Sequence, residues 1–176
     1  MPELEAQGAA NINLVTATHF AHLLPAAVAD ARRRGLTVPI VYNTSGYERV
    51  AAVRELGDIV DVWLTDFKYA DAALGRRLSN VPDYPSRARR ALAQMAAEVD
   101  RRGGVAFDDD GMMRRGIIVR HLVLPGHADD SCRVLDVIWE TAGDVPVSVM
   151  NQYTPNAAVR AAGGELARAV TDEEYE

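Results

Sequence analysis

Five short apolar runs alternate with helical segments along the chain, and this alternation constrains the fold more than any other feature. The predicted strands are Ile12–Val15, Val38–Tyr42, Ile59–Leu64, Ile117–Leu124 and Pro146–Met150. The connections between them are too long for hairpins and contain helical patterns, which is typical of right-handed crossovers between parallel strands. The sequence therefore predicts an α/β fold with a parallel sheet, as found in both (β/α) barrels and open α/β sheets.

The helices are predicted from alanine-rich and amphipathic segments that end in arginine or glycine. They cover residues 25–34, 47–56, 70–78, 86–102 (with Ser86 as the cap) and 131–141, and a short helical tail covers Pro2–Gln7. Thr171 to Glu174 forms a capping box that starts a further helix. We expect residues 1–176 to form a single domain that is cut through helices at both ends. Residues 103–116 are predicted to be a surface loop, with a hairpin left open as an alternative.

Composition excludes several functional classes. The net charge of −6 gives no global support for nucleic-acid binding. The single cysteine, Cys132, fits a reducing compartment and cannot by itself hold an iron–sulfur cluster. No apolar run approaches the roughly 20 residues that span a membrane, and no signal peptide is recognisable. We therefore expect a cytoplasmic protein without nucleic-acid or membrane partners.

Polar side chains collect where the apolar runs end, and in α/β folds the carboxyl ends of the strands form the active face. The central run, IVDVWLTDFKY, ends in Asp66 and in Lys68, which is the only lysine of the chain. Arg120 and His121 are adjacent in one strand and must face opposite sides. An inward arginine needs an anion, either the carboxylate or phosphate of a ligand or Asp66 in a structural ion pair. His121 is predicted to pack in the core or against a helix.

Metal and serine-nucleophile chemistry find no support in the sequence. The four histidines show no ligand spacing such as HxH or HExxH, so no metal site is predicted. No GxSxG motif is present. The segment from Asn43 to Gly46 leads into a helix, where backbone amides can hold an anion or form a plain helix-start turn.

Six motifs, taken in chain order, resemble those of the radical S-adenosylmethionine proteins related to pyruvate formate-lyase-activating enzyme. They are GAANINLVTATH, PIVYNTSGYE, VDVWLTDFKY, SNVPDY, GIIVRHLVLPG and VMNQYTP. The resemblance implies a partial (β/α)6 barrel whose first strand precedes a CxxxCxxC loop that holds a [4Fe–4S] cluster. It also implies that S-adenosylmethionine binds this cluster and is cleaved reductively to a 5′-deoxyadenosyl radical. That radical abstracts hydrogen from a substrate, often a glycine of a partner enzyme.

The same resemblance implies ligand-side roles for matching positions. The carboxylate of S-adenosylmethionine is expected beside Asp66 and Lys68, with Arg120 as an inward contact. The remaining implied cofactor-binding residues are Thr16, Thr18 and His19 near the methionine amino group, Asn43 and Ser45 at the second strand end, and Gln152 and Tyr153 at the last.

The chain departs from this family in one serious respect, because the cysteine motif and the first strand are missing. We therefore expect about five strands, no cluster ligated by this chain alone, and an inactive fragment. Its expected partner is a protein substrate carrying a target glycine or a complementary N-terminal fragment. Two alternatives remain: a Schiff-base lyase of the aldolase kind using Lys68 on a (β/α) barrel, and a non-catalytic remnant that binds a partner chain.

Overall fold

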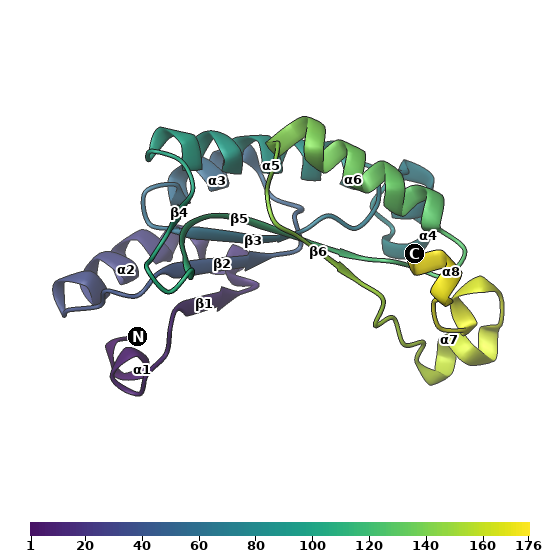
Figure 1. The fold of residues 1–176 in the computed structure, drawn as a ribbon, viewed down its shortest axis with the longest axis horizontal. Helices are drawn as coiled ribbons and strands as arrows, with labels where there is room; N and C mark the ends of the chain where they lie inside the picture. The colour runs from purple at the N-terminus through teal and green to yellow at the C-terminus, as the bar shows by residue number, and fades with distance from the viewer.

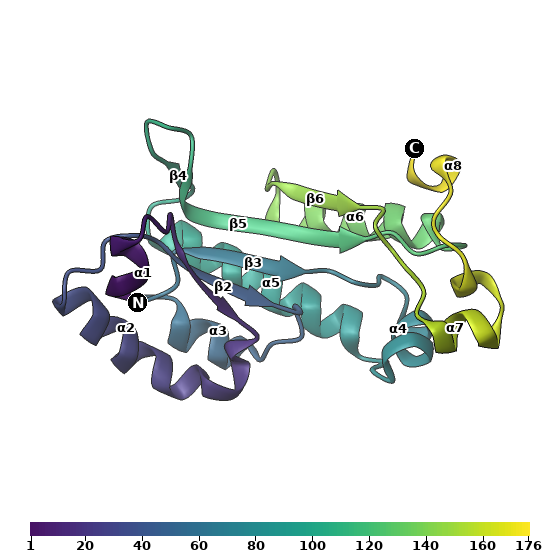
Figure 2. The same ribbon diagram turned by 90° about the horizontal axis from the view of Figure 1, so that it is seen from below.

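The computed structural model describes residues 1–176 and contains one open sheet with helices packed mainly on one of its faces (Figures 1 and 2). The strand order is β1-β2-β3-β5-β4, and β6 pairs with β5. All pairings are parallel except that between β4 and β5. The strands are β1 (Ile12–Val15), β2 (Ile40–Thr44), β3 (Val62–Asp66), β4 (Ala106–Phe107), β5 (Met113–Leu122) and β6 (Val147–Met150). The predicted α/β class and parallel sheet are confirmed.

Helices connect the parallel strands as the alternation predicts. They are α1 (Pro2–Ala6), α2 (Leu24–Arg33), α3 (Val50–Leu56), α4 (Ala72–Ser79), α5 (Tyr84–Arg101), α6 (Ala128–Ala142), α7 (Ala157–Ala162) and α8 (Asp172–Tyr175). Two 3-10 segments, η1 (Ala17–Leu23) and η2 (Glu165–Ala167), complete the chain. The predicted capping box is confirmed, because Thr171 and Glu174 cap α8 reciprocally.

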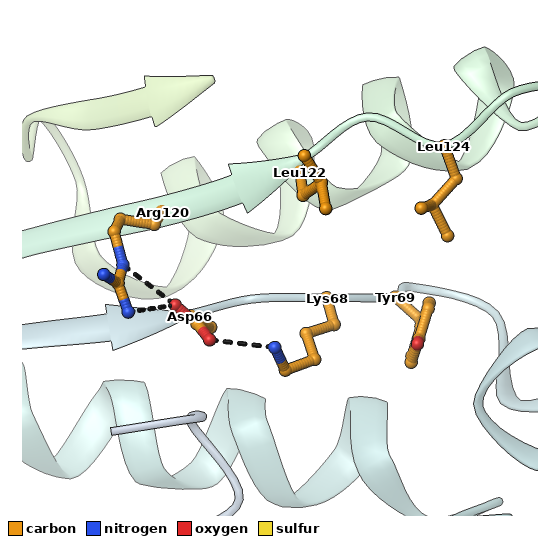
Figure 3. A pocket seen from close by; sticks show the side chains of 6 residues that line it. All are labelled: Asp66, Lys68, Tyr69, Arg120, Leu122 and Leu124. Atoms are coloured by element: carbon orange, nitrogen blue, oxygen red, sulfur yellow. Dashed lines mark hydrogen bonds and ion pairs between the residues drawn. The ribbon is translucent and has the colours of Figure 1, made fainter. Parts of the chain in front are cut away.

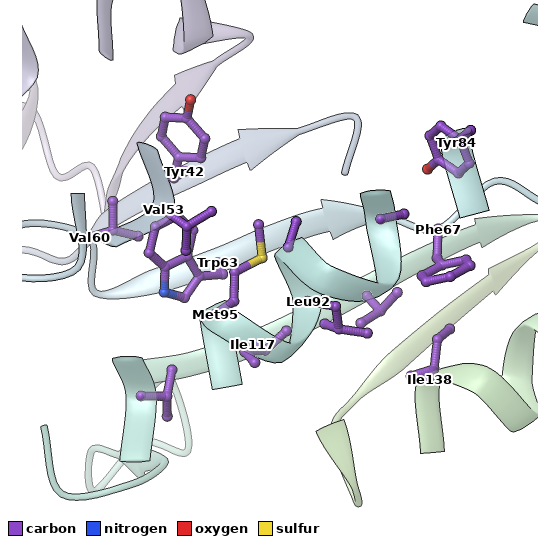
Figure 4. Packing of buried hydrophobic residues seen from close by; sticks show 14 of the residues in the cluster. Tyr42, Val53, Val60, Trp63, Phe67, Tyr84, Leu92, Met95, Ile117 and Ile138 are labelled. Atoms are coloured by element: carbon purple, nitrogen blue, oxygen red, sulfur yellow. The ribbon is translucent and has the colours of Figure 1, made fainter. Parts of the chain in front are cut away.

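The main core lies between the sheet and α5 (Figure 4). Trp63 of β3 is buried there with an edge-to-face contact to Tyr42 of β2, with ring centroids 5.6 Å apart. Helix α5 contributes Leu92 and Met95 from a stripe of apolar residues spaced three and four apart. Each large apolar side chain buried in this way contributes about 1.5–3 kcal/mol to folding.

The two faces of the sheet differ in chemistry. Strand register places Tyr42 beside Trp63, and both side chains point into the helix layer. Asp66 lies beside Arg120 on the opposite face, where no helix packs. Alternation along the strands therefore separates a face buried under the helices from an open face. The open face carries apolar side chains such as Leu64 and Ile118 in its middle and ionisable groups at the carboxyl ends of the strands.

Three details of the prediction are corrected. The sheet has six strands rather than about five, since residues 103–116 contain β4, which pairs antiparallel with the start of β5. The second and third strands extend to Thr44 and Asp66, because their ladder runs on to the pair Thr44–Thr65. Helix α5 begins at Tyr84, so Ser86 is not its cap and its hydroxyl donates to the carbonyl of Asp83 instead.

Candidate functional site

Four polar side chains meet on the open face of the sheet near the carboxyl ends of β2, β3 and β5 (Figure 3 shows three of them). Arg120 donates from Nε and Nη2 to Oδ1 of Asp66, at 2.9 and 2.7 Å. Its Nη2 also donates to Oδ1 of Asn43 at 2.8 Å. Lys68 donates from Nζ to Oδ2 of Asp66 at 2.8 Å. We call these residues the strand-end cluster. The predicted ion pair between Asp66 and Arg120 is thus present.

The strand-end cluster retains unused hydrogen-bond donors. Nη1 of Arg120 has no partner within the protein, and Nζ of Lys68 has only Asp66. The two side chains are 30% and 41% exposed. Two cations and one carboxylate leave a net charge of +1. The cluster can therefore accept an added anion, and a guanidinium and an ammonium suit a carboxylate.

A pocket adjoins the strand-end cluster. Its empty volume is about 390 Å³, and its walls combine Asp66, Lys68 and Arg120 with Tyr69, Leu122 and Leu124 (Figure 3). The leucines follow the cluster along β5 and its continuation. A ligand in this pocket would have an anionic group at one end and apolar surface at the other.

The backbone of the site is held by Tyr84, whose buried hydroxyl joins two strand ends. It donates to the carbonyl oxygen of Ser45 at 2.8 Å, and the carbonyl of Asp66 lies 3.2 Å away. It accepts from the backbone N–H of Lys68 at 3.0 Å. Burial raises the pKa of Tyr84, so the phenol keeps its proton. The SNVPDY segment thus fixes the turns that carry Asp66 and Lys68.

Gly46 permits this close approach of the two strand ends. Its φ is +80°, a conformation that disfavours side chains. A Cβ at this position would lie 2.1 Å from the carbonyl oxygen of Asp66. Only glycine therefore fits between the end of β2 and the end of β3.

His121 supports the same strand end from the helix side of the sheet, as predicted for a core histidine. Its Nδ1 lies 2.7 Å from the carbonyl oxygen of Phe67, and its Nε2 lies 2.9 Å from Oγ of Ser131 in α6. Because a carbonyl only accepts, Nδ1 carries the proton and Nε2 accepts from Ser131. Burial lowers the pKa of His121, since the charged ring would be desolvated.

We expect stability to fall as the pH is lowered through the range in which His121 protonates. The native pKa lies below the unfolded value of about 6.5, so the unfolded state binds more protons in that interval. The contribution of the neutral His121 ring to the free energy of unfolding is therefore complete above pH ~6.5. It is lost progressively as the pH falls below that value. Denaturant unfolding at a series of pH values, with an NMR titration of the imidazole, measures both quantities. A ring that titrates above its unfolded pKa would contradict the expectation.

The first strand end lies outside the strand-end cluster. Thr18 donates to Oε1 of the buried Glu48 at 2.6 Å, and Thr44 donates to the same oxygen at 2.7 Å. The hydroxyl of Tyr42 also donates to Oε1 of Glu48, at 3.4 Å. Burial raises the pKa of Tyr42 to about 12. This carboxylate network was not foreseen, although three hydroxyl residues near one glutamate were the available signal.

Five other predicted site residues take no part in the strand-end cluster, and their role as ligand contacts stays a prediction. Four are exposed, namely Thr16, His19, Ser45 and Gln152, and Tyr153 is partly buried. Thr16 has a left-handed backbone and His19 lies in η1. Ser45 contributes only its carbonyl, to Tyr84. Tyr153 donates to the carbonyl of Leu166, and the side-chain amide of Gln152 contacts the sulfur of Met150. The sequence signal gave no indication that Tyr84 and Gly46 support the site, because their contacts lie far away along the chain.

The structure contains no group of residues suited to a metal. No three histidine, cysteine, aspartate or glutamate side chains come together for this purpose. Cys132 is exposed on α6 and has no second thiol beside it. The residues present therefore do not fit a [4Fe–4S] cluster. No helix is both long and apolar enough to cross a bilayer.

Lys68 is not isolated in the way that a Schiff-base nucleophile requires. Its ammonium pairs with Asp66 and is 41% exposed. A Schiff-base lysine is activated by desolvation in a hydrophobic pocket or by a neighbouring cation, whereas this Nζ donates to a carboxylate at 2.8 Å. The geometry thus gives no specific support to the lyase alternative.

Part of one curated protein and one domain of known structure are similar to this chain. No family model matches it. The uncharacterized protein MJ0674 of Methanocaldococcus jannaschii is 30% identical over 146 residues, which are 82% of this chain and 38% of that protein. The chain therefore spans well under half the length of this curated relative.

A solved structure with some likeness is a domain of pyruvate-formate lyase-activating enzyme from Bacteroides vulgatus. The match covers 80% of this chain and 97% of that domain, at 12% identity and a TM-score of 0.42.

Proposed function

We propose that this chain is the barrel portion of a radical S-adenosylmethionine protein of the glycyl-radical-activating type. Its strand-end cluster would bind the carboxylate of S-adenosylmethionine. The observation that carries the proposal is the free donor pair of Lys68 and Arg120, which faces a pocket at the carboxyl ends of parallel strands. The six motifs in family order lead to the same ligand.

In this proposal each member of the strand-end cluster has a defined task. Lys68 and Arg120 hold the ligand carboxylate through charge-assisted hydrogen bonds. Asp66 bonds to both cations and fixes their orientation, and Asn43 holds Nη2 of Arg120. Leu122 and Leu124 offer apolar surface to the rest of the ligand. S-adenosylmethionine, once bound and reduced, supplies the radical chemistry of the family.

The cluster thiolates would come from outside residues 1–176, because the chain has a single exposed cysteine. A protein substrate with a target glycine belongs to the same proposal. The proposal also includes a cysteine-bearing segment, which would supply the thiolates and complete the site.

Binding of S-adenosylmethionine to the chain alone is expected to be weak, with a dissociation constant on the order of 1 mM, because no iron chelates the methionyl group. Backbone-amide NMR during titration should report shifts around Lys68 and Arg120. Lys68→Met or Arg120→Met should weaken binding about tenfold, as expected for one charged hydrogen bond. The matched control is Arg90→Met, since Arg90 contacts only the backbone carbonyl of Ser86. Equal weakening by all three variants would overturn the assignment of the site.

Reconstitution with iron and sulfide should leave the isolated chain without a stoichiometric cluster. The reason is its lack of thiolate ligands. The measurement is the iron content together with the absorbance near ~400 nm that thiolate-bound clusters show. Cys132→Ala should give the same background as the unchanged chain. A full four-iron cluster on the unchanged chain would contradict the prediction.

A further inference from the structure

Helix α6 carries two large apolar side chains that remain exposed, Trp139 for most of its surface and Leu135 for about a third. Leu135 and Trp139 are spaced four residues apart and therefore share one side of the helix. They are 37% and 65% exposed. The other tryptophan, Trp63, is buried in the core. An indole left in water beside a leucine is unusual for a side chain that gains so much from burial.

This side of α6 faces away from α5. Glu140, which is on the α5 side of the helix, pairs with Arg89 of α5 at 3.1 Å. Val134 and Ile138 point into the core. Leu135 and Trp139 lie on the remaining side of the helix, away from α5. Figure 2 shows that β6 forms the edge of the sheet on the side of α6 away from α5.

The edge strand β6 carries two apolar side chains on the same face of the sheet as α6, and one of them, Val147, packs partly against the main core. Val147 and Val149 are opposite Val119 and His121 of β5, so they face the helix layer. Both are only partly buried, and β6 pairs with β5 alone. Helix α7, which follows β6, buries no residue. We call Leu135, Trp139, Val147 and Val149 the α6–β6 surface.

Acidic side chains without ion pairs border the α6–β6 surface. Asp136 follows Leu135 on the solvent side of α6, Asp129 lies two turns earlier on that side, and Asp144 follows the end of the helix. None of the three forms an ion pair, whereas Asp130 and Glu140 are paired with arginines. Two copies meeting through this surface would bring like charges together, which is unfavourable. The border instead complements a basic partner.

We propose that the α6–β6 surface binds an amphipathic helix of a partner polypeptide, with lysine or arginine beside its apolar face. Trp139 is the central contact, in the manner of the aromatic residues that dominate such interfaces. The docked helix packs against β6 on the same face of the sheet on which α6 packs against β5. Its lysine or arginine side chains form ion pairs with Asp136 and Asp144. This mode is helix-in-groove recognition. The inference is independent of S-adenosylmethionine binding, because the strand-end cluster is on the other face of the sheet.

The test uses the full chain and two synthetic helical peptides of about 18 residues, a length that sustains a helix. Both peptides have leucine at helical spacing on one side. One has lysine at all other positions and the second has glutamate. Isothermal titration measures affinity and stoichiometry, and the emission of Trp139 is followed against that of buried Trp63. We expect one lysine peptide per chain, a blue shift of the emission, and no binding of the glutamate peptide.

Substitution locates the binding. Trp139→Ala is expected to weaken the lysine peptide about thirty-fold, the loss typical of a central interface residue. The control is Phe107→Ala, a residue 56% exposed on the hairpin of β4, which should leave affinity unchanged. Equal affinities for Trp139→Ala and the unchanged chain would overturn the proposal, as would equal binding of both peptides. A dimer of the chain that disappears on Trp139→Ala, measured by light scattering, would also overturn it and identify a second copy as the occupant.

Discussion

Replacing Tyr84 by phenylalanine is expected to lower the free energy of unfolding by about 3 kcal/mol. The substitution removes one hydroxyl and leaves the rest of the ring in place. The carbonyl of Ser45 and the N–H of Lys68 then lose the partner that they share, the hydroxyl of the buried Tyr84, in a part-buried position. Each unsatisfied buried group costs about 1–3 kcal/mol. For a chain of this size the melting temperature should fall by about 10 °C.

Tyr47→Phe is the matched control for this prediction. The Tyr47 hydroxyl also donates a hydrogen bond, to Asp83 at 2.8 Å, but on the exposed surface. Its removal should cost less than about 1 kcal/mol. Denaturant unfolding of both variants measures the difference. If Tyr84→Phe were as mild as Tyr47→Phe, the phenol could not be what holds the two strand ends together.

Gly46→Ala should destabilise the protein still more, by at least about 4 kcal/mol. The added Cβ would meet the backbone oxygen of Asp66 at 2.1 Å and the Tyr84 hydroxyl at 3.2 Å. A backbone atom cannot move aside as a flexible side chain can. Relief of the contact would separate the end of β2 from the end of β3, and the strand-end cluster would open.

Gly104→Ala isolates the effect of this contact. Gly104 has almost the same φ, +82° against +80°, but a Cβ there would meet nothing within 4 Å. Its substitution should cost only the conformational strain of about 1–2 kcal/mol. Equilibrium unfolding measures the loss in the free energy of unfolding for each variant. The difference between the two losses is the cost of the contact between the added Cβ and the carbonyl oxygen of Asp66. Equal losses would mean that the strand ends tolerate the extra carbon.

The uncovered face of the sheet and the α6–β6 surface are separate features with separate chemistry. One presents cations with free donors beside an apolar pocket. The other presents Trp139 beside unpaired acidic residues. A ligand that is anionic and a partner that is basic can therefore bind the same chain without competing.

The sequence alone determined the class of fold and the faces of the strands. Alternating strand and helix patterns required parallel pairing, since the connections are long. The two-residue period of a strand placed Arg120 and His121 on opposite faces, and the structure confirms this with Asp66 on one side and Ser131 on the other. These properties follow from backbone geometry, which acts within a few residues.

Tertiary structure decided which strand ends meet and how they are held. Asn43 reaches Arg120 across 77 positions of sequence, and Tyr84 bridges Ser45 and Lys68. Thr18, itself predicted as a ligand contact, donates to Glu48, which lies 30 positions away in the sequence. Strand register and the approach of distant segments depend on how helices pack across the whole sheet. Because no local pattern contains that information, the sequence could indicate the ionisable residues of the site but not the contacts that arrange them.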